Sequence, residues 1–347
     1  MNLKKSLSIA VILGLLSVIA WELYWRSQGL MPNIDDNKNL WANQRARLEN
    51  ATDKTVVFIG SSRILYDINL DIWEKETNTE SIMLATQGAS PIPVLKDIVD
   101  KTEFNGTLIV GITPPLFFAT TYPEAQFIKR SQSLVDYYYK RTYAQRLNHI
   151  LSVPLQKNLA FIRDGDEEWD SDVDLKTLLK KIHIGNNRSG PIYPPFNNFE
   201  EITLDRRMKM PEIMVTDTAY ANTVKNVWKA ILTGDNPPPD KESTTSAFSE
   251  LAKEFKARGG NLILVRCPSS GLFKEVESKG FPREQFWDYL VEKSKPDRAY
   301  NYMDFEEFQN LFLPEWSHLS AEDAEVFTRG LIKTMEADGA LSNLKTN

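Results

Sequence analysis

The sequence contains a single cysteine and only three histidines among 347 residues. Cys267 has no second thiol to pair with, so cysteine usage does not indicate the redox compartment, and we expect this side chain to be a small buried hydrophobe. No two histidines have the spacing of metal ligands, and no cluster of His, Cys, Asp and Glu has the pattern of a zinc site. A glycine-rich loop of the phosphate-binding kind is also missing. The sequence therefore predicts neither a metal nor a cofactor.

The sequence also has fewer basic than acidic residues. The 41 Lys and Arg residues are outnumbered by 47 Asp and Glu, which gives a formal net charge of -6 and a pI near 5.4. Because no stretch is rich in Lys and Arg, we expect no nucleic-acid partner. Hydrophobic residues make up 42% of the chain and aromatic residues 11%. This is enough apolar surface for a full core, in one large domain or two small ones.

The one long hydrophobic run lies at the N-terminus. Lys4 and Lys5 precede an almost unbroken apolar stretch from Leu7 to Trp21. Its length is short for a membrane span and long for a signal-peptide core, and Ser17–Ala20 is a poor cleavage site because bulky aromatic residues follow it. We therefore expect an uncleaved membrane anchor over residues 1–28 rather than a cleaved signal. The lysines place the N-terminus in the cytoplasm and the main domain in the periplasm or the extracellular space.

Beyond the anchor, the pattern predicts a polar stalk and a juxtamembrane helix over residues 29–54, followed by an α/β domain over residues 55–340. Strands are expected at 55–59, 81–85, 107–112, 261–266 and 300–305, and helices at 40–48, 69–75, 91–99, 131–150, 217–232, 243–258, 283–293 and 321–337. Alternating strands and helices favour a parallel sheet with right-handed crossovers. The predicted fold is a flavodoxin-like three-layer α/β domain with a large insertion at about 119–240.

The insertion is the least informative part of the sequence. Residues 163–174 are acidic and predict a loop. The stretch Tyr193–Phe196, with two prolines between its aromatic residues, either forms a lip over a ligand or packs a loop onto its own domain. His149 and His183 also fall here, and we expect both to be surface or packing residues.

The first strand of the domain ends abruptly in a small, hydroxyl-rich turn. Val56–Ile59 has the composition of a strand buried on both faces, and Gly60 allows the backbone to turn sharply. Ser61 or Ser62 would then cap the following helix. Such a turn brings a side-chain oxygen to the carboxyl end of a parallel sheet, where open α/β sheets bind ligands. These residues fit a serine nucleophile and equally a serine that only caps a helix.

The only histidine outside the insertion is His318, which lies in a loop just before the last predicted helix. Glu315 precedes it by three residues. A carboxylate at this spacing can orient the imidazole through one ring nitrogen and leave the other free to take a proton from a serine. The order along the chain is Ser62, Glu315, His318.

This layout resembles the SGNH, or GDSL-like, hydrolase superfamily, in particular the membrane-anchored extracytoplasmic branch similar to the alginate O-acetylation proteins and DltD. Gly60-Ser61-Ser62 resembles the Gly-Asp-Ser block, which implies that Ser62 is the nucleophile. Gly88, in the Thr-Gln-Gly-Ala stretch 86–89, resembles the second block, whose glycine N–H serves the oxyanion hole. The stretch from Glu315 to His318 resembles the Asp-x-x-His block. The matching parts cover roughly residues 55–118 and 243–337.

Two positions depart from the family pattern. Thr113 stands where the third block supplies an oxyanion-hole asparagine, and Glu315 stands in place of aspartate. Thr113 could donate to the oxyanion only through its hydroxyl or its backbone, beside the N–H groups of Ser62 and Gly88. Related catalytic sites do accept glutamate in the orienting position.

The resemblance implies an extracytoplasmic serine esterase or O-acyltransferase that acts on acyl groups of an envelope or secreted polysaccharide. A glycan or acyl-carrying substrate and a membrane-bound acyl donor protein are the partners it implies. The alternative is a catalytically inactive SGNH-like scaffold or binding subunit of a membrane-bound polysaccharide biosynthesis or modification complex.

A third interpretation is an unrelated flavodoxin-like domain in which Ser62 caps a helix and His318 packs in the core. The distance between Ser62 Oγ and a His318 ring nitrogen separates these cases. A triad requires about 2.6 to 3.5 Å, and a separation beyond about 6 Å argues against one.

Overall fold

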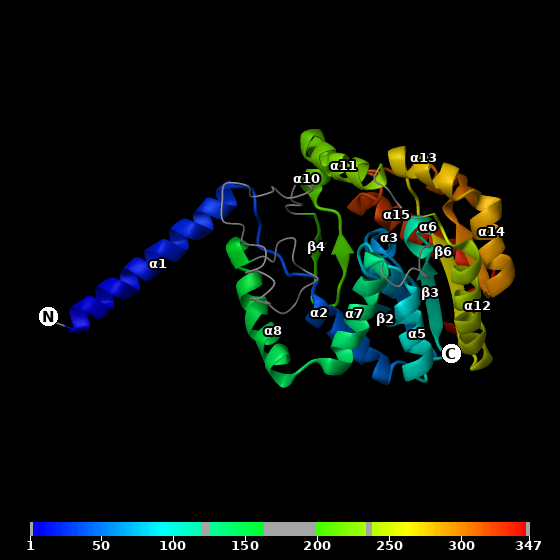
Figure 1. The fold of residues 1–347 in the computed structure, drawn as a ribbon, viewed down its shortest axis with the longest axis horizontal. Helices are drawn as coiled ribbons and strands as arrows, with labels where there is room; N and C mark the ends of the chain where they lie inside the picture. The colour runs from blue at the N-terminus through cyan, green and yellow to red at the C-terminus, as the bar shows by residue number, and fades with distance from the viewer. Residues whose placement is uncertain (1–2, 119–124, 163–198, 234–237, 345–347) are drawn as a thin grey trace.

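The protein has an α/β domain preceded by one long N-terminal helix, α1 (Leu3–Ser27), as Figure 1 shows. The computed structural model describes residues 3–118, 125–162, 199–233 and 238–344. The acidic loop expected at 163–174, the stretch Tyr193–Phe196 and His183 lie outside these residues. Helix α1 is apolar, with a mean hydropathy of 2.1 over 18 residues, and is long enough to cross a membrane.

A parallel five-stranded sheet with the order β2-β1-β3-β6-β7 forms the centre of the domain. Its strands are β1 (Val56–Ile59), β2 (Ser81–Met83), β3 (Thr107–Gly111), β6 (Asn261–Arg266) and β7 (Arg298–Asn301). In register, Val56 of β1 pairs with Ser81 on one side and with Thr107 on the other. The chain moves outward from β1 to β2 and then crosses to the other side of β1 for β3. This change of direction is a topological switch point between β1 and β3, and open α/β sheets usually bind ligands outside the carboxyl ends of their strands at such a point.

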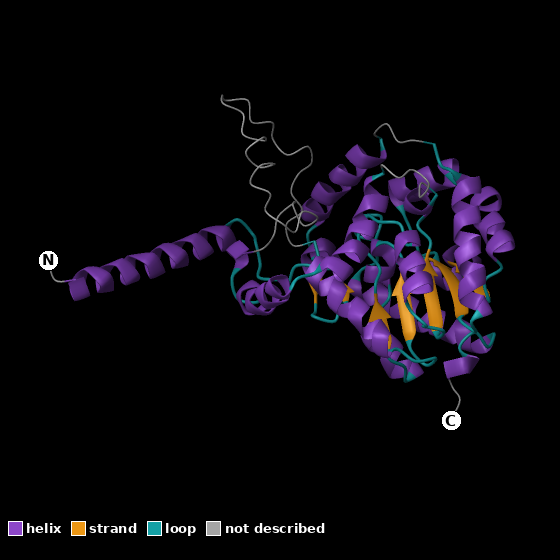
Figure 2. Ribbon diagram, turned by 60° about the horizontal axis from the view of Figure 1, so that its bottom comes forward, coloured by secondary structure: helices purple, strands orange, loops and turns teal. Residues whose placement is uncertain are grey.

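Helices cover both faces of the sheet, which lies between them in Figure 2. Successive residues of β1 point to opposite faces, so Val56 and Phe58 belong to one core and Val57 and Ile59 to the other. The first core is closed by α3 (Ser62–Asp67), α4 (Leu70–Thr77) and α15 (Ala321–Ala337). The second is closed by α5 (Ile92–Lys101), α7 (Gln126–Lys140), α12 (Lys241–Ala257) and α14 (Arg283–Ser294).

The segment predicted as a stalk is part of the domain from Ile34 onward. Ile34 and Leu40 are buried in the first core, and Trp41 of α2 (Lys38–Arg47) is buried in the second. The Trp41 indole donates a hydrogen bond to the carbonyl of Leu84, just past β2, at 3.0 Å. Helix α2 therefore covers the edge of the sheet, and the α/β domain begins well before residue 55.

The described part of the insertion adds no strand to the central sheet. It contains α7, α8 (Tyr143–Gln156), α10 (Glu212–Thr216), α11 (Thr218–Leu232), and a separate antiparallel pair of β4 (Glu201–Ile202) and β5 (Met208–Lys209). The single helix expected over 131–150 is wrong. Thr142 and Gln145 form a capping box that starts a new helix, because the Thr142 side chain accepts from the Gln145 N–H and the Gln145 side chain accepts from the Thr142 N–H.

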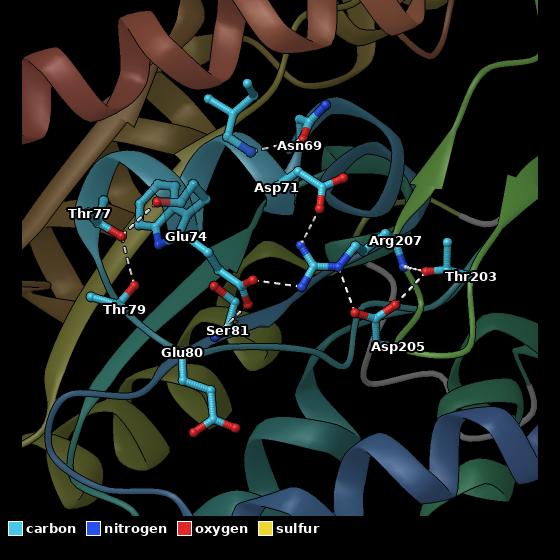
Figure 3. A network of polar contacts seen from close by, with 12 residues as sticks. Asn69, Asp71, Glu74, Thr77, Thr79, Glu80, Ser81, Thr203, Asp205 and Arg207 are labelled. Atoms are coloured by element: carbon cyan, nitrogen blue, oxygen red, sulfur yellow. Dashed lines mark hydrogen bonds and ion pairs between the residues drawn. The ribbon is translucent and has the colours of Figure 1, made fainter.

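Two arginines fix the β4–β5 pair to the domain. The buried Arg206 side chain makes two hydrogen bonds to the Asp36 carboxylate, at 2.6 and 2.7 Å. The neighbouring Arg207 reaches Asp71 at 2.8 Å and Glu74 at 2.6 Å, both on α4, as Figure 3 shows. This strand pair therefore joins α4 to the segment before α2.

Two further differences lie in the C-terminal half. The strand expected at 300–305 is β7, which starts earlier, and Tyr302–Asp304 forms a 3-10 turn in which the Asn301 side chain accepts from the Met303 N–H at 3.1 Å. Helix α13 (Gly271–Gly280) is absent from the sequence prediction. The prediction for α15 is confirmed, including Ser320 as the N-cap residue.

Candidate active site

Ser62 is the first residue of α3 and follows the tight turn at the end of β1. The turn requires Gly60, whose φ is +155°, because a Cβ there would lie 2.9 Å from a side-chain carbon of Ile64 and 3.1 Å from the Gly111 Cα. The Ser61 hydroxyl is buried and lies 2.6 Å from the Thr113 hydroxyl. Of the two serines, Ser62 is therefore the one that faces the histidine.

The structure brings the three residues singled out by the sequence into one chain of hydrogen bonds. Ser62 Oγ lies 2.8 Å from His318 Nε2, and His318 Nδ1 lies 2.8 Å from Glu315 Oε1. The same Glu315 oxygen accepts the backbone N–H of His318 at 2.7 Å. His318 and Glu315 are buried, whereas Ser62 is partly exposed. This is the geometry in which an imidazole can remove a proton from an accessible hydroxyl.

An unusual backbone conformation shapes the loop that presents Glu315 and His318. Trp316 between them has a φ of +78°, in the left-handed region that non-glycine residues rarely adopt. Its carbonyl accepts the Ser270 N–H at 3.0 Å, and its ring packs on Gly271, where a Cβ would lie 2.5 Å from the indole. The start of α13 thus holds the strained turn in place, a contact that the sequence alone did not reveal.

Trp228 of α11 extends the hydrogen-bond chain beyond the glutamate. Its indole N–H donates to Glu315 Oε2, the oxygen that does not face the histidine. In the sequence, Trp228 follows Val224 by four residues on the apolar face of a predicted helix, which signals an inward position but not its partner. Sequence reasoning missed this residue because it lies in the insertion, to which the resemblance gave no role.

Aromatic rings enclose the imidazole. The ring of Tyr66, on α3, has its centroid 4.5 Å from that of His318, and the ring of Phe199, which precedes β4, lies at 5.7 Å. Trp228 lies at 6.3 Å from the same ring. Two of these three rings come from the insertion, so part of the wall around His318 lies outside the segments that resemble the family.

Two of the predicted oxyanion-hole residues, Gly88 and Thr113, lie next to different side chains: Gly88 next to Arg130 and Thr113 next to Ser61. Gly88 has a φ of +55°, in the left-handed region that favours glycine, and a Cβ there would lie 2.5 Å from an Arg130 guanidinium nitrogen. Arg130 donates to the neighbouring Gln87 carbonyl at 3.2 Å. The Thr113 hydroxyl lies against Ser61 and supports the turn before Ser62.

Buried polar side chains lie next to this site. Asp67, at the end of α3, accepts the Leu319 N–H at 2.9 Å and so holds the residue after His318. Burial raises the pKa of Asp67 well above its usual range, although the Leu319 hydrogen bond and the charge of Arg63 oppose this. Burial also raises the pKa of the neighbouring Cys267 thiol. Cys267 is thus the buried side chain that the sequence predicts.

A buried ion-pair cluster holds the residue that follows Ser62. Arg63 lies 2.6 Å from the Glu277 carboxylate on α13, and Arg266 lies 3.2 Å from the same side chain. Although burial acts to raise it, the charges of these two arginines lower the pKa of Glu277. The cluster ties the start of α3 to α13.

Among the described residues, the other histidine, His149, lies away from the site. His149 is buried on α8, where burial lowers its pKa, in agreement with a packing role. Within the residues that the structure describes, no group of three or more His, Cys, Asp or Glu side chains could hold a metal ion. No protein-family model matches the chain, and a search of the curated proteins found no match.

Proposed function

We propose that the domain is a serine esterase or O-acyltransferase of the SGNH type, with Ser62 as nucleophile, His318 as general base and Glu315 as the orienting carboxylate. The observation that carries this proposal is the hydrogen-bond chain from Ser62 Oγ through both His318 nitrogens to Glu315. The strand order β2-β1-β3-β6-β7 supports it, because it matches the flavodoxin-like order, in which ligands bind at the switch between the first and third strands.

Ordinary acyl-transfer chemistry follows from this arrangement. His318 Nε2 takes the Ser62 proton as Oγ attacks the acyl carbonyl, and the same proton then goes to the departing alcohol. Water or a sugar hydroxyl next loses its proton to His318, attacks the acyl-serine and releases the acid or the new ester. His318 returns that proton to the departing Ser62 Oγ, which restores the free site. Glu315 keeps the Nδ1–H tautomer and stabilises the imidazolium. The N–H groups of Ser62 and Gly88 are the proposed donors to the oxyanion.

The two residues that depart from the family pattern, Glu315 and Thr113, each have specific contacts in the structure. The longer Glu315 is held by the turn at Trp316 and by the Trp228 indole. Thr113 has its hydroxyl against Ser61, and loss of one oxyanion donor costs roughly 100- to 1000-fold in rate. We therefore propose a slow enzyme, and a covalent probe tests it better than turnover does.

The proposed location comes from helix α1, and the proposed substrate comes from the family resemblance. Helix α1 would anchor the protein with its N-terminus in the cytoplasm and the domain outside, as Lys4 and Lys5 indicate. The acyl groups of an envelope or secreted polysaccharide, and a membrane-bound acyl donor protein, come from the resemblance. The inactive scaffold is the second candidate, and the replacement of the oxyanion asparagine by Thr113 favours it.

Covalent labelling of the full chain in detergent with a fluorophosphonate separates enzyme from scaffold. We expect one adduct, located on Ser62 by mass spectrometry, that Ser62→Ala and His318→Ala abolish. Ser61→Ala is the matched control and keeps the label, because the Ser61 hydroxyl lies against Thr113. A folded wild-type protein that takes no label would overturn the esterase and leave the scaffold.

If the wild-type protein takes the label, a fresh, unlabelled sample is then incubated with 4-nitrophenyl acetate, with and without an oligosaccharide acceptor. Acetylated sugar in the mass spectrum identifies a transferase, and acetate alone identifies a hydrolase.

A further inference from the structure

Helix α8 has an apolar side that nothing in the described structure covers. Its large hydrophobic side chains are between 44% and 81% exposed: Tyr143, Leu147, Ile150, Leu151 and Leu155. Tyr143, Leu147, Leu151 and Leu155 repeat every four residues, and Ile150 follows Leu147 by three. This spacing places all five on one side of the helix, here called the outer face of α8. A contiguous exposed apolar face of this kind marks an interaction surface.

The opposite side of α8 is polar and points into the protein. His149 and Gln156 are the buried residues of this helix. The Gln156 amide donates to the Asp35 carboxylate at 2.7 Å, in the segment before α2. Helix α8 is thus turned the opposite way from an ordinary surface helix, whose apolar side faces the core. An apolar medium outside the protein would explain this orientation.

The end of α8 is attached to the end of the membrane anchor. Arg26 of α1 donates to the Asn158 carbonyl at 3.1 Å, two residues past α8. Glu22 of α1 accepts the backbone N–H groups of Ala160 and Phe161, at 3.0 and 3.3 Å. Figures 1 and 2 both show α8 beside the point where α1 joins the domain. A bilayer crossed by α1 would therefore end close to α8.

Basic side chains accompany the outer face. Arg146 and the C-cap residue Lys157 are exposed and lie eleven residues apart, about three helical turns, so they lie on the same side of the helix. Amphipathic helices that lie in a membrane interface combine an apolar face with Lys and Arg that contact anionic headgroups.

We propose that α8 lies in the lipid–water interface of the membrane that α1 spans, with its outer face in the headgroup–acyl boundary. This contact goes beyond the proposed chemistry and rests on α1 as a membrane span. Two attachments, one spanning and one interfacial, fix how the domain is turned toward the membrane. The Ser62 site then has a defined orientation relative to the membrane. Such an orientation would let the site receive an acyl group from a donor protein in the same membrane.

Site-specific fluorescence on the full chain tests the proposal. Cys267 is buried and is the only native cysteine, so Leu151→Cys provides one reactive thiol for an environment-sensitive nitrobenzoxadiazole label. The protein is placed in vesicles of phosphatidylcholine and phosphatidylglycerol, with or without a nitroxide on the lipid acyl chain. We expect the label at Leu151→Cys to emit at shorter wavelength and to be quenched severalfold more by the nitroxide lipid than a label at Val326→Cys. Val326 is exposed on α15 and is the control.

A third label, at Leu13→Cys, reports on α1 itself. If Leu13→Cys is quenched while Leu151→Cys behaves like Val326→Cys, the interfacial helix is overturned and the anchor stands. If Leu151→Cys emits at shorter wavelength but is not quenched, a second copy or another protein covers the face, which also overturns the proposal. If neither label is quenched, both membrane contacts are overturned. Fluorophosphonate labelling is read separately, so these outcomes are independent of the proposed chemistry.

Discussion

Glu315 is a fully buried carboxylate, and hydrogen bonds from surrounding N–H groups hold it in position. It accepts from the His318 ring, from the His318 backbone and from the Trp228 indole. A buried charge is tolerated only where hydrogen bonds replace water. Trp228 therefore completes the set of donors and fixes the rotation of the carboxyl group that orients His318.

We expect Trp228→Phe to slow the labelling of Ser62. Phenylalanine keeps an aromatic ring against Phe199 but removes the donor to Glu315. A hydrogen bond to a charged group contributes about 1.5 to 3 kcal/mol. If all of this is lost from the transition state, the maximal labelling rate falls by roughly 10- to 150-fold. The apparent affinity for the probe changes little.

Phe199→Leu is the matched control for Trp228→Phe. It loosens the wall around His318 and leaves the indole donor in place, so its maximal rate stays closer to wild type. Equal rates for Trp228→Phe and wild type would show that the indole has no positioning role.

At the scale of elements, the β4–β5 pair is held by two arginines in very different surroundings. Arg206 is buried, has a φ of +61°, and pairs with the buried Asp36. Arg207 is partly exposed and contacts acidic side chains that also reach solvent. The pair matters to the site because Phe199, two residues before β4, packs on His318.

We expect Arg206→Met to destabilise the protein far more than Arg207→Met. Removing Arg206 leaves the Asp36 carboxylate buried without its partner, which costs about 3 to 5 kcal/mol in the free energy of unfolding. The Arg207 contacts are solvent-screened, and each contributes about 0.2 to 1 kcal/mol. Urea unfolding of the full chain in detergent measures both.

Lys209→Met is the control for these two variants, because Lys209 pairs with Glu201 on the exposed side of the same strands. Similar losses for Arg206→Met and Lys209→Met would contradict the role given to the buried pair.

At the scale of the whole molecule, folding buries the Asp67 carboxyl group next to the candidate site. Burial raises its pKa above the ordinary value of 3.8. At low pH both folded and unfolded chains hold this proton. As the pH rises past 3.8 the unfolded chain loses the proton first, so unfolding becomes easier until the pH passes the raised folded value. This contribution to stability is therefore present in acid and lost toward higher pH.

Asp67→Asn removes this titration and keeps an oxygen for the Leu319 N–H. We expect the variant to gain stability over wild type as the pH rises from about 4 to about 8, with the smallest difference at the acid end. Thermal unfolding in detergent across that range gives the measurement, with the exposed Glu275→Gln as control. A constant difference between Asp67→Asn and wild type at every pH would contradict the raised pKa.

Much of the central fold follows from local sequence. The apolar run of β1, the helix signals around α15 and its Ser320 cap, and the strand β6 all lie where their residues predict them, because propensity and capping act between near neighbours. The start of the domain was not predicted in this way. Residues 40–48 predict a brief juxtamembrane helix outside the domain, and only the contact of Trp41 with the sheet edge shows that α2 belongs to it. Contacts between distant segments, rather than propensity, decide such elements.

The candidate site also has a part that the sequence predicts and a part that only tertiary contacts determine. The sequence by itself predicted Glu315 and His318 as candidates, because a carboxylate three residues before a histidine is a local pattern with a chemical meaning. The turn after the first strand predicted a serine there, and the family resemblance implied Ser62 rather than Ser61. Only the tertiary structure decided that Trp228 and Phe199 surround them, that Thr113 faces Ser61, and that the outer face of α8 is turned away from the core. These are pairings between residues far apart in the chain, and their partners are set by packing, which no local pattern encodes.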